Sequence, residues 1–135
     1  MTRILVVDDK PKTRGLLAEA AHVSGAEVVT AESAKEAIQK IAQETFDVVL
    51  TDMKMETPEA GLEVLKAAKA KDVYTQVIVI TAYGTPRISV ETMSWGAFDY
   101  IEKNAPGTDV LGMIKSKVDL ALDYRRAKLR ESNAR

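Results

Sequence analysis

The sequence has no cysteine, no long apolar run and almost no net charge. Without cysteine, neither a disulfide framework nor a thiolate metal site is possible. No apolar run approaches the roughly 18 to 20 residues of a membrane span, and Met1 leads directly into a strand pattern, which leaves no room for a signal peptide. The net charge of −1, from 19 basic and 20 acidic residues, gives no whole-chain case for nucleic acid or an anionic membrane. We therefore expect a soluble, cytoplasmic protein.

Short apolar runs alternate with helical patterns along the 135 residues. Most runs are rich in β-branched residues and are bounded by polar ones, which is typical of strands buried on both faces of a parallel sheet. The alternation predicts one α/β domain, a flavodoxin-like doubly wound sheet of five parallel strands in the order 2-1-3-4-5, with helices on both faces. The predicted strands are residues 3–7, 28–31, 46–52, 77–80 and 98–101.

The last helical pattern, from about residue 108 to 131, is longer than the mean helix of about 11 to 12 residues. We therefore expect the domain to cover residues 1–122, with residues 123–135 as an extension of the last helix or a linker. Leu122 and Leu129 are seven residues apart. The extension could thus pair with its copy in a homodimer, although a single heptad is all that supports this.

Charged and hydroxyl side chains follow the ends of four predicted strands. Asp8 and Asp9 follow the first strand, Asp52 ends the third, Thr81 ends the fourth, and Lys103 stands just past the fifth. In the predicted strand order the first and third strands are neighbours, so these side chains meet in one crevice at the carboxyl ends of the strands. The alternative is an acidic cluster that only caps helices.

Three carboxylates in one pocket cannot all stay charged without a cation. A hard divalent ion with oxygen ligands solves that problem, and Mg²⁺ fits better than a calcium cage or zinc, since no histidine or cysteine cluster is present. Two carboxylates at the metal leave Asp52 as a nucleophile for a phosphoryl group. The Lys103 ammonium would neutralise charge on the transferring oxygens, and Thr81 would donate its hydroxyl.

The segments ILVVDD, DVVLTD, VIVITAY and FDYIEK resemble the receiver domains of two-component response regulators, over residues 3–122. The resemblance implies a signalling domain that catalyses only its own phosphorylation and dephosphorylation. A histidine kinase or a histidine phosphotransfer protein would donate the phosphoryl group to Asp52. Asp9 would bind Mg²⁺ directly, Asp8 mainly through water, and Lys54 through its backbone carbonyl.

The same resemblance implies a conformational switch and a lifetime for the phosphoryl group on Asp52. Thr81 and Lys103 would contact the phosphoryl oxygens, and Tyr100 matches the aromatic residue that changes rotamer and remodels the surface of the fourth helix, fifth strand and fifth helix. Lys54 and Tyr83 occupy positions that tune dephosphorylation in the family. This pair is similar to that of long-lived phosphorelay receivers, which predicts slow loss of the phosphoryl group.

Two features depart from the family pattern. Residues 52–61 are one residue longer than the usual loop, with Pro58 later than the usual proline. Asn104 follows Lys103 in place of the proline that introduces a cis peptide bond in the family. Because a cis bond before a non-proline residue costs about 2.5–4 kcal/mol, we expect a trans bond here.

Three other functions compete with a phosphoacceptor. A Mg²⁺-dependent phosphohydrolase of the haloacid dehalogenase type would carry an aspartate where this chain has Lys54. A flavodoxin-like cofactor binder would carry a phosphate loop after the first strand, where Asp8 and Asp9 would repel phosphate. A degenerate receiver would bind partners without phosphorylation. The sequence names no kinase or pathway, and it shows no DNA-binding or effector segment of its own, although a downstream effector domain or protein is a possible partner.

Overall fold

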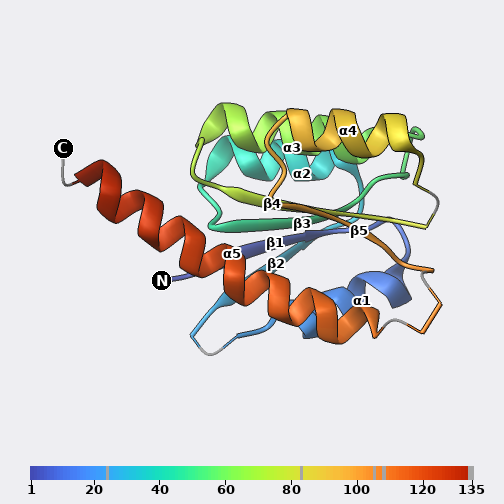
Figure 1. Ribbon diagram of the computed structural model, residues 1–135, viewed down its shortest axis with the longest axis horizontal. Helices are drawn as coiled ribbons and strands as arrows, with labels where there is room; N and C mark the ends of the chain where they lie inside the picture. Colours follow the sequence, from blue (N-terminus) through green and yellow to red (C-terminus); the bar gives the residue numbers. More distant parts are fainter. Residues whose placement is uncertain (24, 83, 105, 108, 134–135) are drawn as a thin grey trace.

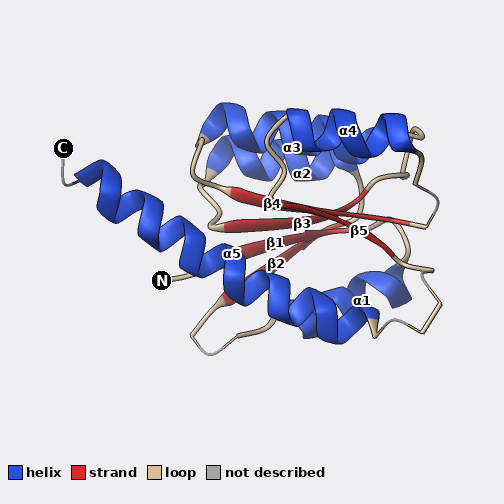
Figure 2. Cartoon of the chain, in the orientation of Figure 1, coloured by secondary structure: helices blue, strands red, loops and turns tan. Residues whose placement is uncertain are grey.

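The chain forms five parallel β-strands that alternate with five α-helices (Figures 1 and 2). This computed structural model describes residues 1–23, 25–82, 84–104, 106–107 and 109–133. None of the helices in that part of the chain is long and apolar enough to cross a membrane. In chain order the elements are β1 (Arg3–Val7), α1 (Pro11–Ala21), β2 (Glu27–Ala31), α2 (Ala34–Gln43), β3 (Val48–Asp52), α3 (Ala60–Lys71), β4 (Gln76–Thr81), α4 (Pro86–Ser94), β5 (Asp99–Glu102) and α5 (Val110–Asn133).

The strands lie in the order β2-β1-β3-β4-β5, which confirms the predicted fold class and strand order. Figure 1 shows α2, α3 and α4 on one face of the sheet and α1 and α5 on the other. The central strands are therefore covered on both sides, which is why their middle positions are apolar and their polar residues lie at or next to the strand ends. The predicted strand at 46–52 begins at Val48 in the structure, two residues late.

Two hydrophobic clusters hold the three layers together. Alternate residues of one strand contribute to opposite clusters, because successive side chains point to opposite faces of a sheet. Leu5 and Val49 pack under α2 and α3, whereas Ile4 and Leu50 pack against α1 and α5. This packing fixes the strand register and so fixes the positions of the residues that follow each strand.

The final helix is longer than the sheet requires. α5 has 24 residues, and Figure 1 shows its C-terminal end projecting beyond the sheet. Leu122 is only 4% exposed and packs in the core, so the expectation that it pairs with a second copy through a Leu122–Leu129 seam is wrong. The division of the chain after residue 122 remains a prediction.

The turn after β5 has the predicted peptide geometry. No cis bond occurs among the described residues, so the Lys103–Asn104 bond is trans. The Asn104 side chain donates a hydrogen bond to the carbonyl oxygen of Ala82 (3.3 Å) and thereby joins this turn to the one after β4.

Candidate functional site

Three carboxylates meet at the carboxyl ends of β1 and β3. Each of Asp8, Asp9 and Asp52 offers an oxygen, and these oxygens lie within 4.8 Å of one another. Asp8 is fully buried and Asp52 is 3% exposed, whereas Asp9 is open to solvent. The cluster follows from the pairing of β1 with β3, because both strands end at the same edge of the sheet.

Lys103 brings a positive charge to this cluster from the end of β5. Its Nζ lies 3.2 Å from Oδ2 of Asp52 and 3.6 Å from Oδ2 of Asp8. Its backbone N–H donates to the carbonyl oxygen of Thr81 (2.7 Å), which fixes the end of β5 beside the end of β4. The single ammonium therefore compensates part of the charge of two buried carboxylates.

The two oxygens of Asp52 have different surroundings. Oδ1 accepts a hydrogen bond from the backbone N–H of Met53 (2.9 Å), while Oδ2 faces Lys103. Burial raises the pKa of the Asp52 carboxyl; the Lys103 charge lowers it, and the Asp8 charge raises it again. One oxygen is thus held by the backbone, and the other lies beside Lys103 in the cavity.

The residues present fit a hard divalent cation. Asp8 Oδ1 accepts from the backbone N–H of Lys10 (2.8 Å), but its Oδ2 is buried and accepts no hydrogen bond from the described residues. Lys103 Nζ, 3.6 Å from this oxygen, is beyond hydrogen-bond distance and is closer to Asp52, so the oxygen still favours a second cation. The three carboxylates supply oxygen ligands alone, and exposed Asp9 leaves room for the water that magnesium retains.

A cavity of about 740 Å³ opens over Asp52. Its polar wall includes Asp9, Thr81 and Lys103 from three strand ends, and exposed Lys54 reaches it from the loop after β3. Thr81 itself is 4% exposed. The structure therefore brings Asp9, Asp52, Lys54, Thr81 and Lys103 to one cavity, together with apolar side chains of Met55, Pro58 and Ile88. Asp8 does not line the cavity, but it belongs to the acidic cluster with Asp9 and Asp52.

Tyr100 lies beside this site, on β5. It is half-buried against the cluster under α2 and α3, and a Cβ added to Gly84 would come within 2.7 Å of its hydroxyl oxygen. Burial raises the pKa of the Tyr100 hydroxyl, opposed by the Thr81 side chain and aided by the Glu102 charge. Tyr100 therefore lies next to Thr81. Tyr83 lies outside the described residues.

Gly61 is a site residue that the sequence did not reveal. Its backbone N–H donates to the carbonyl oxygen of Met53 (2.8 Å). A Cβ here would overlap the carbonyl oxygen of Asp52 and lie 2.7 Å from the Cα of Met53. Only glycine lets the first turn of α3 approach the end of β3 this closely. A glycine soon after a strand-ending aspartate was a usable signal, but nothing in the pattern showed the close approach.

Glu56 was also missed, and it explains how the longer loop is held. Its two carboxylate oxygens accept from the backbone N–H groups of Ala34 (2.9 Å) and Lys35 (3.0 Å), at the start of α2. Burial alone would raise the pKa of Glu56, but these hydrogen bonds together outweigh it and lower the pKa. The partners are 22 and 21 residues away, so no local sequence signal exists.

Comparisons with known proteins agree with this geometry. Residues 4–115 match the family model described as the response regulator receiver domain. The chain is 32% identical over 131 residues to the response regulator protein PilR of Pseudomonas aeruginosa, an alignment that covers 96% of this chain but 28% of PilR. A receiver domain protein from Clostridium thermocellum has a TM-score of 0.78 at 28% identity, covering 96% and 98% of the two chains. The beryllofluoride-activated NtrC4 receiver domain dimer has a TM-score of 0.78 at 26% identity, covering 93% and 99%.

Proposed function

Because this chain belongs to the response regulator receiver domain family, we propose that Asp52 accepts a phosphoryl group from a histidine kinase or a histidine phosphotransfer protein. The observation that carries the proposal is the position of Asp52 Oδ2, 3.2 Å from Lys103 Nζ within the acidic cluster. The chain spans 28% of PilR, so activities of the longer relatives are not assigned to it.

The residues of the cavity divide the work of the transfer. Asp52 Oδ2 attacks phosphorus as the bond from phosphorus to the donor nitrogen breaks, and Lys103 compensates charge on the phosphoryl oxygens. Thr81 donates its hydroxyl to one of those oxygens. Magnesium held by Asp9 directly, Asp8 mainly through water, Asp52, and the backbone carbonyl of Lys54 would supply the remaining positive charge.

Output follows from a shift between two arrangements of Thr81 and Tyr100. Once Thr81 is drawn to a phosphoryl oxygen, the space beside it favours an inward Tyr100, and the surface of α4, β5 and α5 is remodelled. Beryllium fluoride, which mimics the phosphoryl group, should change amide shifts across residues 83–103. Changes confined to the direct ligands would remove the basis for this switch.

The phosphoryl group should be lost slowly. Lys54 offers donors but no acceptor to orient the attacking water, and the Tyr83 ring would shield phosphorus. Decay of phosphorylated protein in Lys54→Asn and Tyr83→Ala measures this. Equal decay in wild type and both variants would show that these side chains do not control water.

A downstream effector and a second copy of the chain are proposed partners in the cytoplasm. The similar NtrC4 receiver domain was solved as an activated dimer. In this chain Leu120 and Tyr124 of α5 are 53% and 47% exposed and are available for such a contact, unlike Leu122.

The decisive experiment is incubation with acetyl phosphate and Mg²⁺, read by intact mass. A phosphoacceptor gains one phosphoryl group. A phosphohydrolase would release phosphate continuously without stable label, and a degenerate receiver would show neither label nor release. Either of those two results would overturn the proposal.

A further inference from the structure

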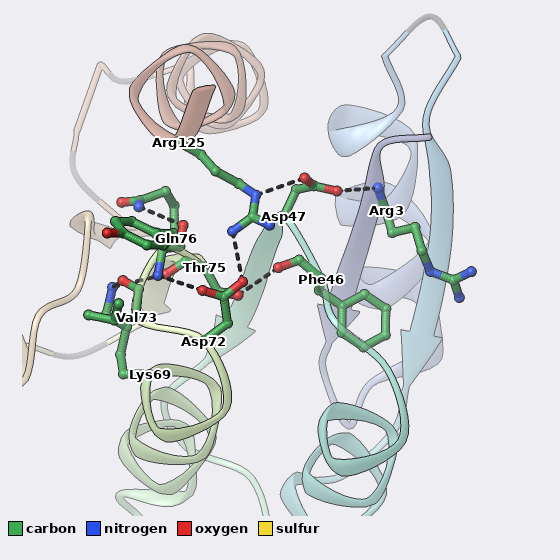
Figure 3. Close-up of polar contacts among 10 residues, drawn as sticks. Arg3, Phe46, Asp47, Lys69, Asp72, Val73, Thr75, Gln76 and Arg125 are labelled. Atoms are coloured by element: carbon green, nitrogen blue, oxygen red, sulfur yellow. Dashed lines mark hydrogen bonds and ion pairs between the residues drawn. The ribbon is translucent and has the colours of Figure 1, made fainter. Parts of the chain in front are cut away.

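The far edge of the sheet, at the amino ends of the strands, holds a second cluster of charged side chains (Figure 3). Arg125 of α5 is 9% exposed. Its Nε donates to Oδ1 of Asp47 (2.8 Å), and its Nη1 donates to Oδ2 of Asp72 (3.1 Å). Asp47 directly precedes β3, and Asp72 is the C-cap of α3. We call these three residues the Arg125 clasp, because they join α5 to two other elements.

Both carboxylates of the clasp are held in place by the backbone. Asp47 Oδ2 accepts from the N–H of Arg3 (2.7 Å), and Asp72 Oδ1 accepts from the N–H of Tyr74 (2.8 Å). Each carboxylate thus has one oxygen fixed and the other directed at Arg125. A planar guanidinium suits this arrangement, since its fork of donors reaches two acceptors at once.

After Arg125, two exposed ion pairs join side chains of α5 to each other. Arg126 pairs with Asp123 (3.4 Å), and Lys128 pairs with Glu131 (3.6 Å); all four side chains are at least 40% exposed. Exposed pairs at this spacing stabilise a helix by only about 0.3–0.5 kcal/mol. Arg125 is the last buried side chain of α5 within the described residues, so the direction of the turns after it depends mainly on Arg125.

We propose that the Arg125 clasp sets the direction of the C-terminal segment of α5, residues 126–133, and that opening the clasp releases this segment while the sheet stays folded. The segment is thereby joined to β3, the strand that carries Asp52 at its opposite end. The clasp does not depend on phosphorylation of Asp52, so it stands or falls separately from the proposed function.

Lys69 lowers the electrostatic cost of opening the clasp, because it can compensate the charge of Asp72. Its Nζ donates to the carbonyl oxygens of Val73 (2.6 Å) and Thr75 (3.0 Å), and it forms no ion pair within the described residues. Burial lowers the pKa of Lys69, the Asp72 charge raises it, and the Arg125 charge lowers it. When Arg125 leaves, the repulsion of Lys69 by Arg125 ends and Lys69 is the cation beside Asp72. The open state then keeps one charge-compensated carboxylate.

Hydrogen exchange of the full chain tests the clasp. Arg125→Met keeps an unbranched side chain of similar length and removes the guanidinium. We expect amides of residues 124–133 to exchange at least about ten-fold faster and to be less protected than amides of β1, β3 and β4, whose exchange should change only as far as global stability falls. Arg126→Met, which breaks an exposed pair next to the clasp, is the matched control and should change exchange less than about two-fold.

Two results would overturn the proposal. Unchanged exchange in residues 124–133 would show that Arg125 does not hold the segment, and equal protection of the segment and the sheet would show that the segment opens only with the whole fold. Asp72→Asn keeps the acceptor for Tyr74 and removes one charge, so it gives a milder test in the same direction if Arg125→Met folds poorly. Repeating the comparison in an Asp52→Asn background should give the same ratios.

A double-mutant cycle tests the part assigned to Lys69. If Lys69 replaces Arg125 beside Asp72, Lys69→Met combined with Arg125→Met lowers the free energy of unfolding by more than the sum of the two single losses. A result equal to that sum would remove Lys69 from the opening.

Discussion

Both edges of the sheet carry aspartates beside a cation. The hydrogen bonds of these aspartates are complete at one edge and incomplete at the other. At each edge two aspartates face one cation. At the amino edge, all four carboxylate oxygens of Asp47 and Asp72 have a hydrogen-bond donor, and the cation is an arginine that reaches both. At the carboxyl edge, Asp8 Oδ2 has no hydrogen-bond donor among the described residues, and Lys103 is a point charge 3.2 and 3.6 Å from two buried oxygens.

This difference separates a structural ion cluster from a reactive one. Completed hydrogen bonds leave the amino edge nothing further to bind, whereas the incomplete set at the carboxyl edge favours an added cation and leaves Asp52 Oδ2 available. Residue types alone would not distinguish the two edges. The difference that bears on function is how many carboxylate oxygens have a hydrogen-bond donor.

The largest contrast should appear in phosphorylation itself. Asp52→Asn should abolish labelling by acetyl phosphate, because Asp8, the other carboxylate beside Lys103, is fully buried and does not line the cavity. Asp47→Asn, at the other end of the same strand, should label to the wild-type extent. Intact mass reads both, and full labelling of Asp52→Asn would place the phosphoacceptor elsewhere.

Mg²⁺ affinity should change in a variant at the carboxyl edge and not in a variant at the amino edge. Asp9→Asn removes one of three clustered carboxylates and should weaken Mg²⁺ binding by about 10–100-fold. Asp72→Asn should leave the affinity unchanged, because its oxygens already have donors. Titration of amide shifts measures both constants; equal losses in the two variants would contradict a site at Asp9.

A substitution at the amino edge should lower the free energy of unfolding. Arg125→Met should lower the free energy of unfolding by about 1–3 kcal/mol. That is less than the roughly 3–5 kcal/mol of an ordinary broken buried pair, because the last turns of α5 can detach and Lys69 can compensate Asp72. Urea unfolding of wild type, Arg125→Met and the control Arg126→Met gives the values. A loss equal to that of the control would show that the clasp contributes no stability.

Glu56 provides a third and smaller case, a carboxylate satisfied by backbone amides without any cation. Its pKa in the folded chain lies below the ordinary value of 4.5, so its contribution to stability is complete above that pH and is lost as the pH falls through the lowered pKa. Glu56→Gln should destabilise the fold by less than about 1 kcal/mol at pH 7. The difference from wild type should vanish in acid; a difference that persists there would mean that shape, and not charge, is responsible.

The sequence predicted the carboxyl edge well and the amino edge hardly at all. Apolar runs that stop at Asp8, Asp52 and Thr81 mark strand ends directly, and the alternation of elements sets which ends are neighbours. Arg125 stands in a charged stretch that resembles a solvated helix end, and its partners are 78 and 53 residues away. Such pairs depend on where helix axes cross the sheet, which no local pattern contains.

Errors in the prediction have the same origin. Leu122 was read by its spacing to Leu129, but a helix that crosses the sheet buries one side as far as the sheet extends, and Leu122 lies within that distance. Gly61 and Glu56 act through contacts made only after the loop closes onto α3 and α2.

The hydrogen bond between Gly61 and Met53 also has a consequence for protein engineering. It closes the loop of residues 54–60 at its base, so the length of the loop is independent of the position of Asp52. Closing a longer loop costs little, about 0.6 kcal/mol for each doubling of its length. A short peptide tag or a fluorophore attachment site inserted between the exposed Thr57 and Pro58 would therefore sit at the rim of the cavity and report on the approach of a phosphoryl donor without displacing the acidic cluster.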